Sequence, residues 1–196
     1  DYVKLLCQDD LIYPAAIERQ VSDLEAQPTA GMAIAQRDMI SASGKILFRG
    51  RGCAGLKDGL VDGRHSLEVG AWQGANIFGE PLAVLFRREP MQAALPWNDE
   101  YPFLLDMFFY AKVLQHHDLV VRKESIGAFR ISTSSWSTRL AGKQKEQFIA
   151  WQRHIEQDVC PQPWFRIAQA RLNNEKTTLL RRGAYAWLRR KGDLSA

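Results

Sequence analysis

Four short segments of the sequence carry side chains whose types and spacing could do chemistry. The first is the acidic pair Asp9-Asp10, which follows the apolar stretch 2–7 and precedes Pro14. Ligands bind at the carboxyl ends of strands in open α/β sheets, and adjacent carboxylates there could hold Mg²⁺ or Mn²⁺ against a diphosphate. The alternative is a polar loop whose acids lie near a helix N-terminus, where the helix dipole favours them. The pair by itself favours this second interpretation and leaves the first open.

The second segment is the apolar run 103–114, which contains the single carboxylate Asp106. The run is apolar on almost all sides and long enough to predict a buried helix. A lone carboxylate is costly to bury unless it is paired or used, and burial raises its pKa toward the range of a general base. A carboxylate near the start of a helix is also a common cap. Both interpretations of Asp106 remain open.

Two further segments are polar. Asn76 and Glu80 lie in the run 76–81, just before an apolar strand, and could donate and accept hydrogen bonds with sugar hydroxyls. Arg130 and Ser132 lie in a run rich in hydroxyl side chains, where an arginine could bind phosphate oxygens. The alternatives are a tight turn for the first segment and a solvated polar loop for the second, and both are favoured by the residues alone.

The pattern of strands and helices that must position these residues predicts an α/β fold. Apolar patterning predicts strands at 2–7, 31–36, 45–48, 82–86, 119–121 and 127–131, and helices at 14–28, 103–114, 144–157, 164–173 and 176–190. Eight of the fourteen glycines lie between 50 and 79, so this stretch is expected to be a long lid or binding loop.

Composition narrows the class of protein. The chain has 196 residues, of which 46% are hydrophobic and 24% charged, and this composition excludes a disordered chain. The net charge of +4 is too small to demand a nucleic-acid partner, and none is expected. Three cysteines without a C-x-x-C pair are typical of reduced thiols in a cytoplasmic protein.

The basic C-terminal segment has two interpretations. On a helix, one half of the surface would be apolar and the other basic. Such a helix could lie on an anionic membrane surface, or its apolar half could pack on Phe148, Trp151 and Ile155 of the preceding helix, which is the favoured alternative. The apolar half consists of Leu179, Leu180, Ala184, Trp187 and Leu188, and the basic residues are Arg181, Arg182, Arg189, Arg190 and Lys191.

Taken in order, the four segments resemble the family 2 glycosyltransferases, which have the GT-A fold. The stretch 2–14 is similar to the family's strand, D-x-D-type motif and proline-started helix, and 76–88 is similar to its N-x-x-G-E-P turn and following strand. Asp106 falls where the family has its acidic base, and 129–132 is similar to its closing Y-R-x-H strand. Two positions depart from the family pattern: Cys7 replaces the first aspartate of D-x-D, and Ser132 replaces the histidine. Both departures bear on the affinity for metal.

The resemblance implies an enzyme that moves a sugar from a nucleotide diphosphate to an acceptor hydroxyl with inversion. Asp106 would be the catalytic base, and Asp9 with Asp10 would hold Mg²⁺ or Mn²⁺ on the diphosphate. The implied partners are a nucleotide-sugar donor and a sugar or lipid-linked acceptor of the kind used in cell-envelope polysaccharide synthesis. The substrate-binding residues would be Asn76, Glu80, Arg130 and Ser132.

The resemblance also implies a division of the chain. Residues 1–138 would be the C-terminal portion of a GT-A domain whose nucleotide-binding half lies upstream, and 139–196 would be a helical, basic extension. The sequence therefore predicts an α/β chain with a mixed sheet, flanking helices and a helical tail. The alternative function is a non-catalytic module that binds a membrane surface or an acidic partner through that tail.

Overall fold

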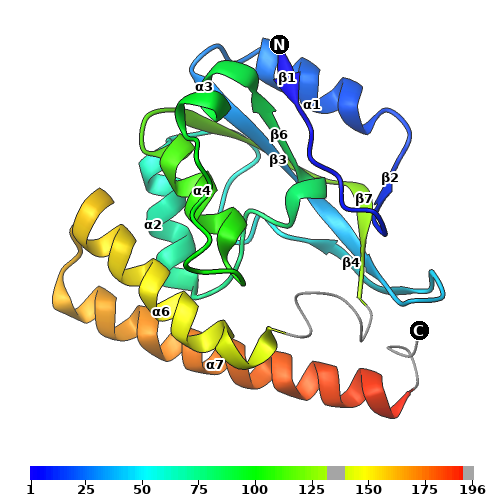
Figure 1. Cartoon of the computed structure of the whole chain (residues 1–196), viewed down its shortest axis with the longest axis vertical. Coiled ribbons are helices and arrows are strands. Elements are labelled where there is room, and N and C mark those ends of the chain that lie inside the picture. The colour runs from blue at the N-terminus through cyan, green and yellow to red at the C-terminus, as the bar shows by residue number, and fades with distance from the viewer. Residues whose placement is uncertain (132–139, 192–196) are drawn as a thin grey trace.

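The computed structural model describes residues 1–131 and 140–191, and these form an α/β fold with a helical C-terminal part (Figure 1). The strands are β1 (Tyr2–Val3), β2 (Leu11–Ile12), β3 (Ala30–Ile40), β4 (Ile46–Arg51), β5 (Gly59–Val61), β6 (Val84–Arg87) and β7 (Asp118–Arg130). The α-helices are α1 (Ala16–Glu25), α2 (Gly63–Gln73), α3 (Arg88–Ala93), α4 (Leu105–Leu114), α6 (Gln144–His154) and α7 (Trp164–Arg190). Short turns of 3₁₀ or π helix are η1 (Pro81–Ala83), η2 (Ala141–Lys143) and η3 (Ile155–Val159).

The strands form one mixed sheet. Its order is β1-β6-β3-β7-β2, with β4 beside β3 and β5 beside β7. The two long strands β3 and β7 run parallel, with Met32 opposite Leu119, and the other pairs are antiparallel. The prediction of a mixed α/β sheet with flanking helices and a helical C-terminal part is confirmed.

Alternating side chains along each strand divide the core between the two faces of the sheet. Met32 and Ile34 of β3 point into the larger core cluster with residues of α2, α4 and α6, whereas Ala33 faces α1 in a smaller cluster with Leu24 and Val120. Figure 1 shows α1 on one side of the sheet and α2 and α4 on the other. The small alanine on the α1 side allows this helix to lie close to the sheet.

The C-terminal helices are joined to the same core. Phe148, Trp151 and Ile155 are buried in the larger cluster. Gln152 of α6 donates hydrogen bonds from its side-chain amide to the carbonyl of Ala71 in α2 (2.8 Å) and to that of Ala170 in α7 (3.1 Å). Helix α7 therefore forms the outermost layer, along the lower edge of the molecule in Figure 1.

The prediction of a long loop at 50–79 is wrong, because this stretch contains strand β5 and helix α2. Asp62 caps α2 by accepting a hydrogen bond from the backbone N–H of His65 (2.7 Å). Gly63 begins the helix where a β-carbon would lie 2.1 Å from the carbonyl oxygen of His117. Gly63 therefore allows the start of α2 to approach the backbone at the end of α4 closely, which a count of glycines cannot distinguish from a flexible loop.

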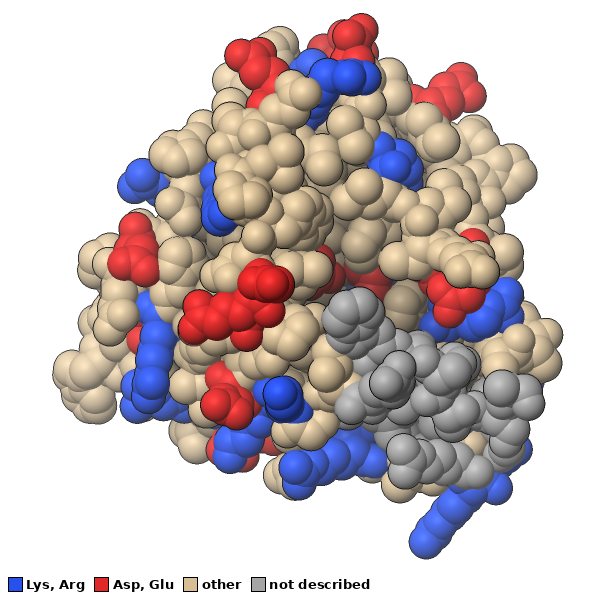
Figure 2. Space-filling model, viewed as in Figure 1, with Lys and Arg blue, Asp and Glu red and all other residues tan. Residues whose placement is uncertain are grey.

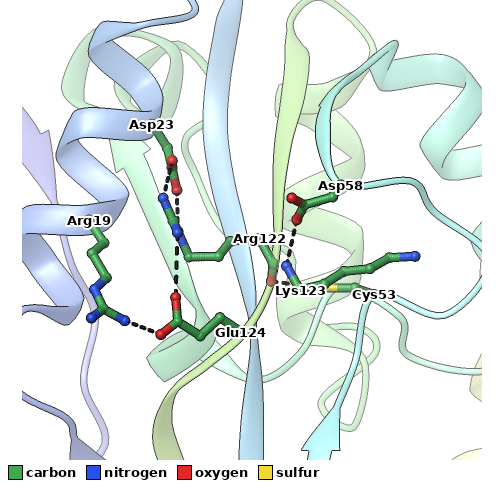
Figure 3. A network of polar contacts seen from close by, with 7 residues as sticks. All are labelled: Arg19, Asp23, Cys53, Asp58, Arg122, Lys123 and Glu124. Atoms are coloured by element: carbon green, nitrogen blue, oxygen red, sulfur yellow. Dashed lines mark hydrogen bonds and ion pairs between the residues drawn. The ribbon is translucent and has the colours of Figure 1, made fainter.

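The two strands predicted at 119–121 and 127–131 are one strand, β7, because the charged residues between them have partners (Figure 3). The Arg122 guanidinium donates two hydrogen bonds to Asp23 of α1, at 2.8 and 2.5 Å. The next backbone N–H, of Lys123, donates to Asp58 (2.7 Å), and Glu124 lies on the α1 side again. The side chains of Arg122 and Glu124 thus connect β7 to α1 on one side, and the backbone of Lys123 connects it to the loop before β5 on the other.

Helix α1 buries a polar side chain beside its apolar ones. Leu24 is buried, but Ile17 is 48% exposed and Gln20 takes a position in the core. The Gln20 amide donates to the carbonyl of Ala83 (2.8 Å) and accepts from the Lys4 ammonium (2.6 Å). Burial lowers the pKa of Lys4 to about 7. A hydrogen-bonded glutamine therefore replaces an apolar side chain at the junction of the N-terminal segment, α1 and η1.

Other boundaries also differ from the prediction, and three of the differences change the arrangement of the chain. The N-terminal strand ends at Val3 rather than at residue 7, and the strand predicted at 82–86 begins at Val84 after η1. The two helices predicted at 164–173 and 176–190 form the single helix α7 of 27 residues. No helix in 1–131 or 140–191 is long and apolar enough to span a membrane.

Candidate active site

The acidic pair Asp9-Asp10 lies in the loop between β1 and β2, and the last residue of β7 holds it there. The backbone N–H of Arg130 donates to Asp10 Oδ1 (3.1 Å), and Arg130 Nε donates to the carbonyl of Asp9 (3.0 Å). Arg130 Nη1 donates to the carbonyls of Ser41 and Ala42 in the β3–β4 turn, at 3.0 and 2.9 Å. Arg130 thus positions the acidic loop through backbone carbonyls.

The two acids of this pair differ in burial. The side chain of Asp9 is exposed, whereas Asp10 is only 7% exposed. The pKa of Asp10 is raised to about 7, chiefly because the carboxyl is buried. The hydrogen bond from the Arg130 N–H lowers this pKa, and the negative charge of Asp9 raises it. Within the part of the chain that the structure describes, Asp10 Oδ2 is buried without a hydrogen-bond partner. This oxygen is the one a cation or a donor from a ligand would satisfy.

The second acidic segment is the turn that leads into β6. Asn76 Oδ1 accepts hydrogen bonds from the backbone N–H groups of Phe78 (3.1 Å) and Gly79 (2.9 Å), and Asn76 Nδ2 donates to the carbonyl of Gly79 (3.3 Å). The amide of Asn76 therefore shapes the turn and positions Glu80 just before η1. Both its oxygen and its nitrogen are engaged in that turn.

Glu80 forms an ion pair with Arg37, a residue of β3 that the sequence analysis did not select. Arg37 Nε donates to Glu80 Oε2 at 2.5 Å, and the guanidinium is almost fully buried. A β-carbon at Gly52 would lie 2.5 Å from Arg37 Nη1, and Gly52 has a φ of +107°, so glycine is required beside the guanidinium. Arg37 Nη1 has no hydrogen-bond partner among the described residues.

Asp106 lies in the first turn of α4 and accepts a hydrogen bond from the backbone N–H of Met107 (2.8 Å). Burial raises the pKa of Asp106 to about 7, the charge of Glu80 adds to the rise, and the Met107 N–H and Arg37 oppose it. The carboxylate therefore makes one of the contacts expected of a helix-terminal acid, and it also has the pKa expected of a general base at neutral pH.

Tyr110 lies one turn after Asp106 and is a second residue that the sequence analysis missed. Its ring is fully buried, and its hydroxyl lacks a hydrogen-bond partner within 1–131 and 140–191. Burial raises the pKa of Tyr110 well above its usual value, and the negative charges of Asp106 and Glu80 raise it further. The spacing of four residues places both side chains on the same face of α4, which is the one signal that could have found Tyr110.

The acids from all three segments meet around Cys7. Partial burial raises the pKa of the Cys7 thiol, and the charges of Asp10, Asp9, Asp106 and Glu80 all add to the rise. In Figure 2 acidic side chains lie at the bottom of a hollow near the centre of this face. We call Asp9, Asp10, Glu80 and Asp106 together with Arg37 the acid cluster. The fold thus brings together four of the residues predicted from separate segments.

Two of the predicted site residues stand apart from this arrangement. The guanidinium of Arg130 and the amide of Asn76 are used in holding the loops of the acid cluster, as described above. Ser132 lies outside the described residues. For Arg37, the only signal in the sequence is the charged pair Arg37-Asp38 directly after an apolar strand.

The donor set suits a cation that is shared with a ligand. Among the described residues, no group of three or more histidine, cysteine, aspartate or glutamate side chains could hold a metal ion. Asp9 and the unpartnered oxygen of Asp10 supply two carboxylates, and Mg²⁺ is commonly bound through one or two carboxylates together with substrate phosphates. The residues present therefore fit a divalent cation held jointly with a phosphorylated ligand.

Comparison of the sequence with family models and with curated proteins gives no match.

Proposed function

We propose that the acid cluster is the catalytic centre of an inverting glycosyltransferase of family 2, with the GT-A fold, that uses a nucleotide-diphosphate sugar as donor. One observation carries this proposal. Asp106 and Asp10 come from segments nearly one hundred positions apart, yet both have a pKa of about 7 and both respond to the charge of Glu80. Their shared response to Glu80 supports placing both carboxylates at one site, as a base and a cation-binding carboxylate that act on one reacting bond would need.

Asp106 is the base of the proposed reaction. Its carboxylate takes the proton of the acceptor hydroxyl as the acceptor oxygen forms a bond to the anomeric carbon of the sugar. The bond from that carbon to the diphosphate oxygen breaks, and its electron pair leaves with the diphosphate. A single displacement inverts the anomeric carbon, so one carboxylate suffices. A pKa of about 7 is close to the optimum for a base at neutral pH.

Asp9 and Asp10 would hold the divalent cation, Mg²⁺ or Mn²⁺. When bound, the cation neutralises negative charge on the leaving diphosphate. The chain's own contribution is to keep the two carboxylates in place: Arg130 donates to Asp10 Oδ1 through its backbone N–H and to the Asp9 carbonyl through Nε. Arg130 is therefore a positioning residue in this proposal.

Glu80 and Arg37 complete the centre. One carboxylate oxygen of Glu80 accepts from Arg37, and the other is available to accept a hydrogen bond from a hydroxyl of the sugar or acceptor. The positive charge of Arg37 also lowers the pKa of Asp106, which favours the ionised base. Asn76 positions Glu80 through the turn that it stabilises.

Calorimetry of the full-length protein with Mn²⁺ and a nucleoside diphosphate tests the proposal. We expect Mn²⁺-dependent binding of the diphosphate to weaken at least about tenfold in Asp9→Asn and in Asp10→Asn, the loss usual for groups that support a metal site. An asparagine at position 10 can still accept from the Arg130 N–H, so the loop should keep its fold. The matched control is Asp99→Asn, an exposed acid outside the acid cluster. Unchanged binding in both variants would overturn the assignment of the cation site.

A further inference from the structure

Helix α7 carries a row of large apolar side chains on its outer surface. These side chains are between 48% and 80% exposed, which is unusual for so many tryptophan, phenylalanine and leucine residues on one helix. We call them the α7 apolar row. Its members are Trp164, Phe165, Leu172, Leu179, Leu180 and Trp187.

The row lies opposite the face by which α7 is attached to the protein. The attached face includes Ala170, Asn174 and Leu188, which are at most 4% exposed. At about 100° per residue, Phe165 and Leu172 fall roughly half a turn away from Asn174 and Ala170 respectively. The apolar row is therefore a second apolar face of the helix rather than the rim of the core.

This arrangement corrects the expectation that the apolar half of the segment packs on α6. Leu188 is buried, against Ile131, but Leu179, Leu180 and Trp187 are exposed. The α7 side chain that lies over the Phe148 ring is Arg181, with its guanidinium carbon 5.1 Å from the ring centre. For Leu179, Leu180 and Trp187 the packing interpretation is wrong.

Helix α7 carries a strong excess of positive charge, part of it on exposed side chains. Its sequence contains six arginines and one lysine but a single acid, Glu175, which forms an ion pair with Lys145. Lys176, Arg182 and Arg190 are exposed. Figure 2 shows basic side chains along the lower edge of the molecule, where α7 runs.

The end groups of the row also suit an interface between water and lipid. Tryptophans stand at both ends of the row, and the Lys191 ammonium lies 4.1 Å from the centre of the Trp187 ring. Tryptophan is enriched where one side of a residue is apolar and the other is wet.

We propose that the α7 apolar row docks in the plane of an anionic lipid surface, with the basic side chains of α7 on the lipid headgroups. An exposed apolar face bordered by arginine and lysine is the pattern of a helix that lies in a membrane interface. A second copy of the chain would bring the same positive charge to the same face, so charge opposes self-association there. An anionic headgroup layer complements both the apolar and the basic parts. This proposal stands independently of the proposed transferase activity.

Co-sedimentation with vesicles tests the proposal. We expect the protein to bind vesicles of phosphatidylglycerol and phosphatidylcholine at low salt, and to be released from them at high salt. Pure phosphatidylcholine should bind it at least about tenfold more weakly, because several basic side chains lose their headgroup partners. Failure to bind the anionic vesicles at low salt would overturn the proposal.

Matched variants locate the docking surface. The double variant Leu172→Gln/Leu179→Gln should lose at least about tenfold in vesicle affinity, and so should Arg182→Gln/Arg190→Gln. The controls are Ile17→Gln/Ile46→Gln, which removes two exposed apolar residues elsewhere, and Lys57→Gln/Arg88→Gln, which removes two exposed cations elsewhere. All the substituted side chains are exposed, and the single variant Trp187→Gln repeats the test if a double variant melts early. Equal losses of vesicle affinity in the variants and in the controls would overturn the proposal. It would also be overturned if the parent chain formed a dimer and the Leu172→Gln/Leu179→Gln variant did not.

Discussion

Arg37 Nε donates a hydrogen bond to Glu80 Oε2, and the charge of this same Glu80 raises the pKa of both Asp10 and Asp106. Glu80, Asp10 and Asp106 thus interact although they come from different segments, and the one buried guanidinium is paired with Glu80. The acid cluster cannot hold all three carboxylates ionised without cost, because the local positive charge is too small. We therefore expect the acid cluster to retain a proton near neutral pH or to bind a cation.

The pH dependence of stability distinguishes a functional Asp106 from a structural one. The pKa of Asp106 is about 7 in the folded chain, whereas an ordinary aspartate has a pKa of 3.8. Between pH 3.8 and about pH 7 the folded state therefore binds more protons than the unfolded state. The ionised form is thus the destabilising one, and the free energy of unfolding should fall as the pH rises from about 4 to about 7. Asp106→Asn removes the part of this fall that Asp106 contributes and leaves the part due to Asp10, so we expect urea unfolding to show a more stable variant at pH 8 and little change at pH 4. A variant that is less stable at pH 8 would show that the carboxylate acts as a helix cap.

The Arg37–Glu80 pair should be strongly coupled. Arg37→Met leaves Glu80 without its partner beside two other acids, and we expect it to lower the free energy of unfolding by at least about 2 kcal/mol. Adding Glu80→Gln should restore part of that loss, with a coupling energy of about 1 kcal/mol or more in a double-mutant cycle. Additive losses in the two single variants would mean that the ion pair contributes little to the folded state.

Arg130 should act on cation binding without changing the base. Arg130→Lys removes the guanidinium contacts to the carbonyls of Asp9, Ser41 and Ala42 but keeps a positive charge. We expect the Mn²⁺-dependent affinity for a nucleoside diphosphate to fall about tenfold to a hundredfold, as for other residues that orient metal ligands. The pH at which activity rises, set by Asp106, should stay the same. A shift of that pH, or affinity equal to that of the control Arg88→Lys, would remove Arg130 from this role.

The helix that replaced the expected glycine loop gives a test of the fold. A β-carbon at Gly63 would lie 2.1 Å from the His117 carbonyl and 2.3 Å from that of Leu114, and neither backbone group can move freely. We expect Gly63→Ala to lower the free energy of unfolding by at least about 2 kcal/mol. The control is Gly183→Ala on α7, where no described atom lies within 4 Å of the new carbon. That change should be neutral or stabilising by up to about 1 kcal/mol, since alanine favours helix. A Gly63→Ala variant as stable as the parent would show that α2 does not contact the end of α4 closely.

The parts of the fold that sequence patterns predicted are those governed by local rules. The apolar run around Asp106 predicted α4 to within two residues of its start, and the alternation of Met32, Ala33 and Ile34 marks a strand between two apolar faces. Asp10, Glu80 and Asp106 were selected as candidates, and the structure places them in one cluster. Charge beside apolar sequence was the signal by which these residues were selected, and their role at a site stays a prediction.

The parts that the patterns missed depend on contacts between distant segments. In the sequence Gly63 suggests a loop, and only the fold shows that the backbone carbonyls near the end of α4 lie against it. Arg122 likewise suggests the end of a strand, because its partner Asp23 is distant in the sequence. Arg37 follows an apolar strand as an ordinary charged residue, and only the fold places Glu80 beside it. Tyr110 lies in an apolar run and was not selected as a candidate. Its hydroxyl is of interest only because the fold places it near the charges of Asp106 and Glu80.

The most direct test of the central claim is the release of nucleoside diphosphate from a panel of nucleotide sugars by the full-length protein as a function of pH. We expect turnover of the best donor to rise with pH through about 7, as Asp106 ionises. In Asp106→Asn it should be at least about 100-fold lower, the usual contribution of a general base, whereas the control Asp99→Asn should match the parent. Near-parental turnover by Asp106→Asn, or the absence of turnover by the parent with every donor in the panel, would contradict the assignment of this acid cluster to glycosyl transfer.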